Sequence, residues 1–298
     1  MNAMWDELMA AVPVLTDGAW GTQMQARGLP IGASPEAWNV SKPDAVFAVA
    51  QAYVDAGSRV ILTNTFGANS IALRRHGLQD RAAEIAFTGA ALSRQAANGR
   101  AHVFASIGPT GLVLAMEEEP PEVIKASFVQ QARNLADGGA DALVIETMSE
   151  LAEARLAVAA ANETGLPVVV SMTYGAGRAG DRTPMGVTPE EAAAELEAAG
   201  ADAIGANCGD GAEQLIAVTT RLRAATRLPL WIKPNAGLPV LENGRAVYRT
   251  SPDDFAAHCC RLVDAGAGFI GGCCGTAPAF IAALHDALAE RGTASDDT

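Results

Sequence analysis

A phrase of small and acidic residues followed by a short β-branched run recurs along this chain of 298 residues. The copy at 138–146 reads GGADALVIE, and related copies span 55–63, 199–207 and 265–273. Glycine permits the left-handed backbone that ends a helix just before the chain turns into a strand. Each copy therefore predicts a junction between a helix and a buried strand.

Further apolar runs complete a regular alternation of strands and helices. They lie at 12–16, 102–107, 168–172 and 230–233, and they bring the predicted strands to eight. All are continuous rather than alternating, which is typical of strands buried on both faces. Helical patterns fill the intervals, at 44–56, 70–97, 121–137, 150–163, 189–199, 211–225, 252–265 and 277–291. This order favours an α/β fold, a (βα)₈ TIM barrel, over an open sheet, and we expect a single domain over residues 1–298.

Charge and hydropathy narrow the class of protein further. The chain has 21 basic and 34 acidic residues, a net charge of −13, and 49% hydrophobic residues. This apolar content can bury a large core, which excludes disorder, and the acidic balance argues against a nucleic-acid partner. The N-terminus is acidic, and glycines and Pro278 interrupt the longest uncharged stretch, 265–285. We therefore expect a cytoplasmic protein without membrane insertion.

The most distinctive polar residues follow the predicted strands. In a TIM barrel the loops after the carboxyl ends of the strands carry the chemistry. The loops of this chain would share one mouth, and their polar segments lie at 17–22, 63–67, 106–110, 146–148, 207–209, 233–237 and 271–275.

Three cysteines stand in these segments. Cys208 ends the sixth predicted strand, and Cys273 and Cys274 end the eighth. Three thiolates without a fourth protein ligand match a catalytic zinc site with one open position, and soft sulfur ligands favour Zn²⁺ over magnesium or calcium. Such a site suits alkyl transfer to a thiol, because the metal lowers the thiol pKa while the anionic ligands preserve its nucleophilicity. We therefore expect these three cysteines to be metal ligands and catalytic residues.

Two other interpretations of the cysteines remain open. They could be ordinary buried cysteines that pack as small apolar groups near the strand ends. The segment 258–260, His-Cys-Cys, is a rival metal cluster. It lies within a predicted helix of the outer ring, where consecutive side chains diverge, so we expect it to bind no metal.

Five motifs carry a family resemblance: DGAWGT at 17–22, WN at 38–39, TNTFGAN at 63–69, GANC at 205–208 and GGCCGT at 271–276. Together they resemble the homocysteine S-methyltransferase family, which includes the homocysteine domain of cobalamin-dependent methionine synthase and betaine-homocysteine methyltransferase. The resemblance implies a barrel enzyme that moves a methyl group to the thiol of L-homocysteine and forms methionine. It also implies that the homocysteine sulfur takes the fourth zinc position.

The same resemblance implies a set of substrate contacts. A zwitterionic amino acid needs an acid for its ammonium group and backbone donors for its carboxylate. One further family position, close to the metal, ligates it when substrate is absent, and here it is Asn235. Turn capping by Asp17, and rim hydrogen bonds from Thr63 and Asn207, are the structural alternatives. The implied homocysteine-binding residues are Asp17, Gly18, Thr63, Glu146, Asn207 and Asn235.

Other functions compete with this interpretation. Lys233, at the end of a predicted strand, permits a Schiff-base aldolase-type barrel, because a buried lysine becomes nucleophilic. A non-enzymatic zinc or redox protein could also use adjacent cysteines. Residues 175–180 spell GAGRAG, but the next predicted helix begins only near Pro189, so a dinucleotide site is not expected.

The methyl donor is open at this stage. A methylated corrinoid carried by a separate protein, S-methylmethionine, S-adenosylmethionine and betaine are all candidates. Betaine would need an aromatic cage, for which Trp20, Trp38 and Tyr174 are available, although Gly67 stands where the betaine enzymes carry a tyrosine. We expect the loop at 175–180 and the loop at 234–251, with a turn at Asn243-Gly244, to act as lids.

Overall fold

Eight parallel strands form a closed barrel in the computed structural model, which describes residues 3–116, 118–242 and 245–296. Their order around the barrel is β1-β10-β7-β6-β5-β4-β3-β2, and a parallel bridge between Thr16 and Val60 joins the last strand to the first. The predicted fold class is confirmed. The strands are β1 (Val14–Leu15), β2 (Val60–Ile61), β3 (His102–Ile107), β4 (Ala142–Met148), β5 (Val168–Met172), β6 (Ala203–Cys208), β7 (Leu230–Pro234) and β10 (Phe269–Ile270).

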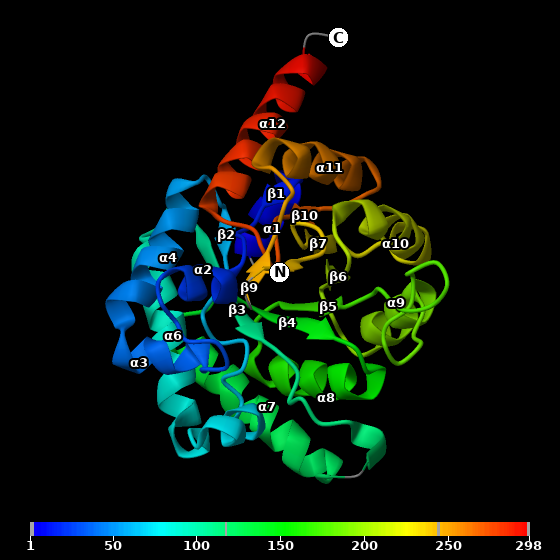
Figure 1. The fold of residues 1–298 in the computed structure, drawn as a ribbon. Helices are drawn as coiled ribbons and strands as arrows, with labels where there is room; N and C mark the ends of the chain where they lie inside the picture. Colours follow the sequence, from blue (N-terminus) through cyan, green and yellow to red (C-terminus); the bar gives the residue numbers. More distant parts are fainter. Residues whose placement is uncertain (1–2, 117, 243–244, 297–298) are drawn as a thin grey trace.

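Helices surround the strands, and Figure 1 shows this outer ring. Their starts follow local chemistry: Thr188 and Glu191 form a capping box before α9, and the Ser251 side chain accepts a hydrogen bond from the Asp254 amide before α11. The ring helices are α4 (Pro43–Asp55), α6 (Ala82–Ala97), α7 (Pro121–Asp137), α8 (Leu151–Ala161), α9 (Pro189–Ala198), α10 (Ala212–Ala225), α11 (Pro252–Asp264) and α12 (Pro278–Asp296).

One predicted helix is interrupted. The pattern over 70–97 predicts continuous helix, but Gly77 adopts a left-handed φ of +65° and breaks it. Residues 70–97 form α5 (Ser70–Leu73), two 3₁₀ turns, η2 (Arg74–His76) and η3 (Gln79–Arg81), and α6. Elements that the sequence pattern did not predict are α1 (Ala3–Ala10), α2 (Trp20–Ala26), η1 (Pro35–Ala37), α3 (Trp38–Ser41), η4 (Leu114–Met116), η5 (Asn162–Thr164) and the hairpin strands β8 (Val240–Glu242) and β9 (Arg245–Val247).

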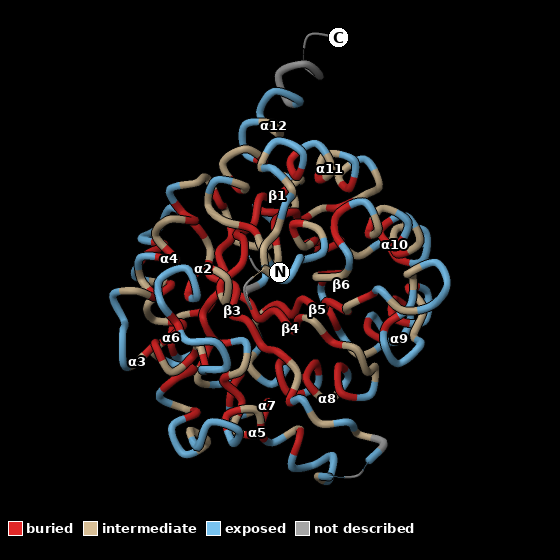
Figure 2. Tube along the Cα trace, viewed as in Figure 1, coloured by how far each residue is buried: buried red, intermediate tan, exposed pale blue. Residues whose placement is uncertain are grey.

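An aromatic cluster fills the barrel near the amino ends of the strands. Trp5 of α1 stacks on Phe104 with ring centroids 6.2 Å apart, and Trp231 and Phe269 pack beside them. The strands are almost wholly buried, as Figure 2 shows. The cluster closes this end of the barrel, so a ligand can enter only from the carboxyl ends of the strands.

No described helix has the length and apolar character needed to cross a bilayer.

Close packing between β6 and β7 depends on Gly205. A Cβ atom there would lie 1.7 Å from the Trp231 carbonyl oxygen, which is backbone and cannot move aside. We expect Gly205→Ala to lower the free energy of unfolding by about 3 kcal/mol or more, measured by urea denaturation. Gly21→Ala is the control, because nothing lies within 4 Å of a Cβ at that position. Equal stability of the two variants would contradict this account of the barrel packing.

Candidate active site

A cavity of about 280 Å³ opens at the carboxyl ends of the strands. Among the predicted site residues, the three cysteines, Gly18, Thr63 and Glu146 line it, whereas Asp17, Asn207 and Asn235 do not. The complete lining is Gly18, Ala19, Trp20, Gly21, Thr22, Pro35, Glu36, Leu62, Thr63, Asn64, Thr65, Phe66, Ser106, Glu146, Thr147, Cys208, Lys233, Gly272, Cys273 and Cys274.

The three predicted cysteines converge at the side of this cavity. The Sγ atoms of Cys208, Cys273 and Cys274 all lie within 4.8 Å of one another, and those of Cys208 and Cys273 are 3.0 Å apart. All three are free thiols. In the described part of the chain, no other group of three His, Cys, Asp or Glu side chains converges in this way, and Cys259 of the rival cluster is buried in the core. The arrangement can hold a metal ion.

The cluster divides protons unequally among its thiols. Hydrogen bonds from Cys208 and Cys273 lower the pKa of Cys274. The pKa of Cys208 is raised well above its ordinary value, first because its hydrogen bonds with Cys273 and Cys274 stabilise the protonated form and then because of burial. Three thiolates within 4.8 Å of one another repel strongly without a cation, and a divalent ion would replace their protons.

Backbone strain marks the strand ends beside the cluster. Thr147 and Cys208 have φ angles of +62° and +63°, in the left-handed region that residues other than glycine rarely adopt. Asn207 holds this arrangement: its Oδ1 accepts hydrogen bonds from the Thr147 amide and the Ser171 hydroxyl, and its Nδ2 donates to Thr147 Oγ1 at 2.7 Å. The same Nδ2 lies 3.5 Å from the Cys208 sulfur. Substrate contact by Asn207 stays a prediction, and its side-chain amide already supports the thiol cluster.

Asp17 is fully engaged beneath the cavity. One carboxylate oxygen accepts hydrogen bonds from Trp20 Nε1 at 2.8 Å and from the Leu62 amide at 2.7 Å, and the other pairs with the Lys233 ammonium. Both side chains of this ion pair are almost completely buried. A Schiff base at Lys233 would break this ion pair and leave the buried Asp17 carboxylate without its counter-charge, so the geometry disfavours the aldolase-type alternative.

Glu146 is the predicted acid that faces the cavity. It is 7% exposed and accepts a hydrogen bond from the Ser106 hydroxyl. Burial, followed by the negative potential of Cys273, raises the pKa of Glu146 to about 7. The carboxyl can therefore exchange a proton near neutrality, or ionise when a cation binds beside it.

The other predicted contacts have distinct positions. Thr63 Oγ1 accepts a hydrogen bond from the Ser106 amide at 3.0 Å. Gly18 has no room for a side chain, because a Cβ there would lie 2.8 Å from Thr276 Oγ1. Asn235 donates to the Gly209 carbonyl oxygen at 2.7 Å, while its Oδ1 is buried and has no hydrogen-bond partner among the described residues.

Sequence reasoning missed several residues of the site. Ser106 donates a hydrogen bond to Glu146, and Thr147 accepts one from Asn207. Glu36, in η1, lines the cavity. Tyr248, after the β8–β9 hairpin, packs so closely on Gly275 that a Cβ there would lie 2.3 Å from its ring. Burial and the neighbouring thiols raise the pKa of Tyr248 to about 12. The one signal for Glu36 in the sequence is that it lies on the connection between the first predicted strand and the helix predicted from 44, which leaves the barrel on the side of the mouth.

The predicted lid segments and aromatic cage have mixed outcomes. The loop at 234–251 carries the β8–β9 hairpin, whereas its predicted turn, Asn243-Gly244, lies outside the described residues. Residues 175–180 precede no helix until Pro189, as expected. Of the three aromatic candidates only Trp20 lines the cavity, and Phe66 joins it there.

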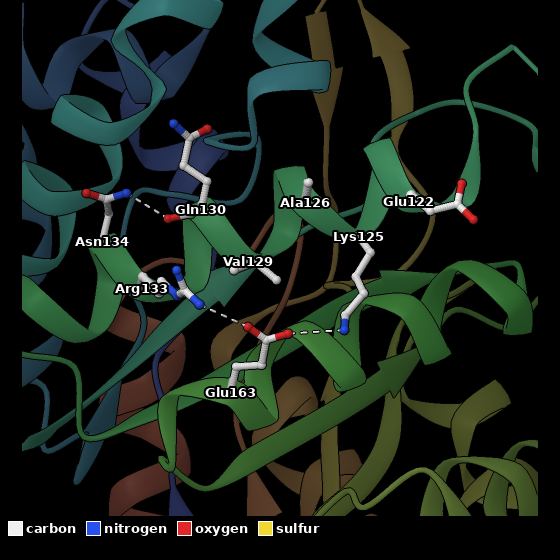
Figure 3. A pocket seen from close by; sticks show the side chains of 8 residues that line it. All are labelled: Glu122, Lys125, Ala126, Val129, Gln130, Arg133, Asn134 and Glu163. Carbon is white, nitrogen blue, oxygen red and sulfur yellow. Dashed lines mark hydrogen bonds and ion pairs between the residues drawn. The ribbon is translucent and has the colours of Figure 1, made fainter.

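A second hollow lies outside the barrel, on α7, with a volume of about 510 Å³. Glu163 forms ion pairs there with Lys125 and Arg133, each at 3.1 Å, as Figure 3 shows. Both basic side chains of this hollow are thus paired with Glu163, so they are not free to bind an anion. Its lining residues are Glu122, Lys125, Ala126, Val129, Gln130, Arg133, Asn134 and Glu163.

A thiol cluster that can hold a metal thus lies in the mouth of a (βα)₈ barrel, at the end where enzymes of this fold carry their chemistry. Comparison with known proteins identifies the family of the chain. The model of the family described as homocysteine S-methyltransferase matches residues 14–288, and the chain belongs to that family. It is therefore an enzyme of the methyltransferase class, as the sequence predicted.

Individual relatives agree with this assignment. The chain is 30% identical to the methionine synthases of Mycobacterium tuberculosis and Mycobacterium leprae, over 92% and 95% of its length. It spans about a quarter of those proteins, 24% and 25%. The metallated form of the homocysteine methyltransferase MmuM from Escherichia coli has a TM-score of 0.79 and 25% identity, covering 95% of this chain and 98% of that one.

The Asp17–Lys233 pair yields a stability prediction. Removing one partner leaves an uncompensated buried charge, so we expect Lys233→Met to lower the free energy of unfolding by about 3–5 kcal/mol. Removing both charges, with Asp17→Asn and Lys233→Met together, should cost less than the sum of the single changes. Urea denaturation of all four proteins completes the cycle, and additive effects would refute a direct interaction.

Glu146 yields a pH prediction for the metal-free protein. Between its ordinary pKa of 4.5 and its folded pKa of about 7, the unfolded chain loses this proton while the folded chain retains it. Stability therefore falls as the pH rises through this window, by about 3 kcal/mol from this group. Glu146→Gln should remove this component, so the stability of the variant relative to the native protein increases from pH 4.5 to 7.5. Parallel pH profiles of the two proteins would argue against the shifted pKa.

Proposed function

We propose that this chain transfers a methyl group to the sulfur of L-homocysteine, forming methionine, and that Cys208, Cys273 and Cys274 hold a catalytic Zn²⁺. The observation that carries the proposal is the convergence of three free thiols, within 4.8 Å, on a cavity of amino-acid size. Soft thiolate ligands favour zinc over magnesium or calcium. Membership of the family and the existence of a metallated form of MmuM support the same conclusion.

The donor set fits the proposed metal. Zinc bound by three thiolates retains one open position, and when bound it would lower the pKa of the homocysteine thiol so that a thiolate is available for methyl transfer. The buried Asn235 Oδ1, which lacks a hydrogen-bond partner among the described residues, supports a role as the ligand that leaves when substrate arrives.

The chain's own residues would orient the substrate. Glu146 faces the cavity, and a substrate ammonium group beside it would favour its ionised form. Asp17 supports this site through the Lys233 pair, and the backbone of Gly18, which lines the cavity, would meet the substrate carboxylate. Asn207 keeps two of the sulfur atoms in place, and Thr63 connects the Glu146 side of the cavity to β2 and β3.

The size of the methyl donor determines how it could reach the thiol cluster, and the redox state of the thiols limits the compartment. If the methyl group arrives on a corrinoid, a separate protein would have to carry it to the mouth of the barrel from outside. A small donor, in contrast, could enter the cavity itself. A reducing compartment such as the cytoplasm would keep Cys208 and Cys273, whose sulfurs are 3.0 Å apart, from oxidising.

Metal binding and turnover test the proposal directly. Protein purified with a thiol reductant should contain about one zinc per chain by elemental analysis. Cys273→Ser should weaken zinc affinity by roughly 100-fold or more and abolish methionine formation from homocysteine with any donor.

Cys260→Ser is the matched control, because Cys260 lies on α11 outside the cavity. It should leave zinc content and turnover unchanged. Full activity of zinc-free native protein, or of Cys273→Ser, would overturn the proposal.

A further inference from the structure

Glu36 is a buried acid that takes no part in the proposed binding of zinc or homocysteine. It lies in η1 and is 6% exposed, and it lines the cavity together with the aromatic rings of Trp20 and Phe66. A buried carboxylate is costly unless hydrogen bonds or a cation compensate its charge. Its partners therefore indicate what the neighbouring space is suited to bind.

The protein satisfies this carboxylate only in part. Ser34 Oγ donates to Oε2 at 2.6 Å, and the Gly67 amide donates to Oε1 at 2.8 Å. A carboxylate has about four acceptor positions, so roughly two remain. Both donors are neutral, and no ion pair joins Glu36 to any basic residue in the described ranges.

The charge balance of the cavity is unfavourable without a further cation. Lys233 is the only basic side chain among the described residues that line it, and its ammonium is already paired with Asp17. Glu36 and the thiol cluster line the same cavity. The proposed metal ion would compensate the charge of the thiolates and not that of Glu36. Glu36 is left with a negative charge and no counter-charge.

Gly67 keeps this carboxylate accessible. A Cβ at position 67 would lie 3.0 Å from Glu36 Oε1 and 3.5 Å from Oε2. The absence of a side chain therefore allows the amide to approach the carboxylate while leaving the adjacent space open. Aromatic faces attract cations, especially weakly hydrated onium groups, and Trp20 and Phe66 supply such faces in the same cavity.

We propose that Glu36 binds the positive charge of a small onium methyl donor, a sulfonium or a quaternary ammonium compound, and so determines donor specificity. The inference rests on the proposed function and refines it. A cavity of about 280 Å³ lies at the lower end of ligand-pocket sizes, which favours a small donor over one that carries a nucleoside or a corrin ring.

Methyl transfer removes the positive charge of the donor. The homocysteine thiolate attacks the methyl carbon, a new S–C bond forms, and the donor's S–C or N–C bond breaks with its electron pair remaining on the donor heteroatom. The donor leaves as a neutral sulfide or tertiary amine centre, so the attraction to Glu36 is lost with the product. Glu36 therefore contributes more to donor binding than to the chemical step.

Glu36→Gln isolates the charge. The amide can keep both hydrogen bonds, accepting from the Gly67 amide and donating to Ser34 Oγ. We expect the KM for betaine or S-methylmethionine, whichever the native enzyme uses, to rise about tenfold or more, with kcat and the KM for homocysteine little changed. Glu153→Gln is the matched control, since Glu153 is equally buried, accepts hydrogen bonds from Thr110 and lies outside the cavity.

The outcomes separate this inference from the proposed function. An unchanged KM in Glu36→Gln, or methionine formation by the native enzyme only with methylcobalamin, would overturn the role of Glu36 and leave methyl transfer intact. If no donor gives methionine, calorimetry of betaine and of S-methylmethionine with the zinc-loaded protein still decides. Binding that Glu36→Gln weakens and Glu153→Gln preserves supports the inference, and equal or absent binding refutes it.

Discussion

The convergence of three cysteine sulfur atoms within 4.8 Å is the constraint on which the rest of the site depends. Closure of the barrel brings Cys208 at the end of β6 within 3.0 Å of Cys273 after β10, although 65 residues separate them in the chain. Such a cluster is electrostatically unstable as three anions, and the surroundings reflect this. Asn207 directs an N–H toward two of the sulfur atoms, and Cys208 accepts an unfavourable left-handed backbone to present its thiol. Strain of this kind persists because the barrel holds both strand ends in place.

The three acids in and below the cavity, Asp17, Glu146 and Glu36, differ in the partners that compensate their charge. Asp17 is neutralised by Lys233 and serves as a scaffold beneath the floor. Glu146 is desolvated and titrates near neutrality, which suits a group that meets a substrate ammonium. Glu36 has only neutral hydrogen-bond donors, which suits a group that meets a cation arriving from outside. Three acids within one mouth are thus distinguished by their partners rather than by their residue type.

Particular elements show how far the sequence was informative. Strands β3 and β5 have the predicted bounds, His102–Ile107 and Val168–Met172, because continuous β-branched runs are specific for buried strands. The predicted helix over 70–97 was wrong in its first half, since its apolar pattern did not reveal that Gly77 would adopt a left-handed conformation. The Asp17–Lys233 pair joins residues 216 positions apart, and nothing in the local pattern of either residue indicates the other. Glu36 escaped notice for a similar reason, because its burial depends on Ser34, Gly67 and the cavity wall.

The sequence by itself determined the alternation of eight strands and helices, and with it the barrel and the loops that carry chemistry, because hydrophobic periodicity and glycine-ended helices are local properties. It also identified Cys208, Cys273 and Cys274 as a set, since their motifs follow predicted strands. Only the tertiary structure decided which acid is paired, which has a raised pKa and which lacks a counter-charge. Those properties depend on desolvation and on partners brought together by barrel closure, and neither is encoded at short range along the chain.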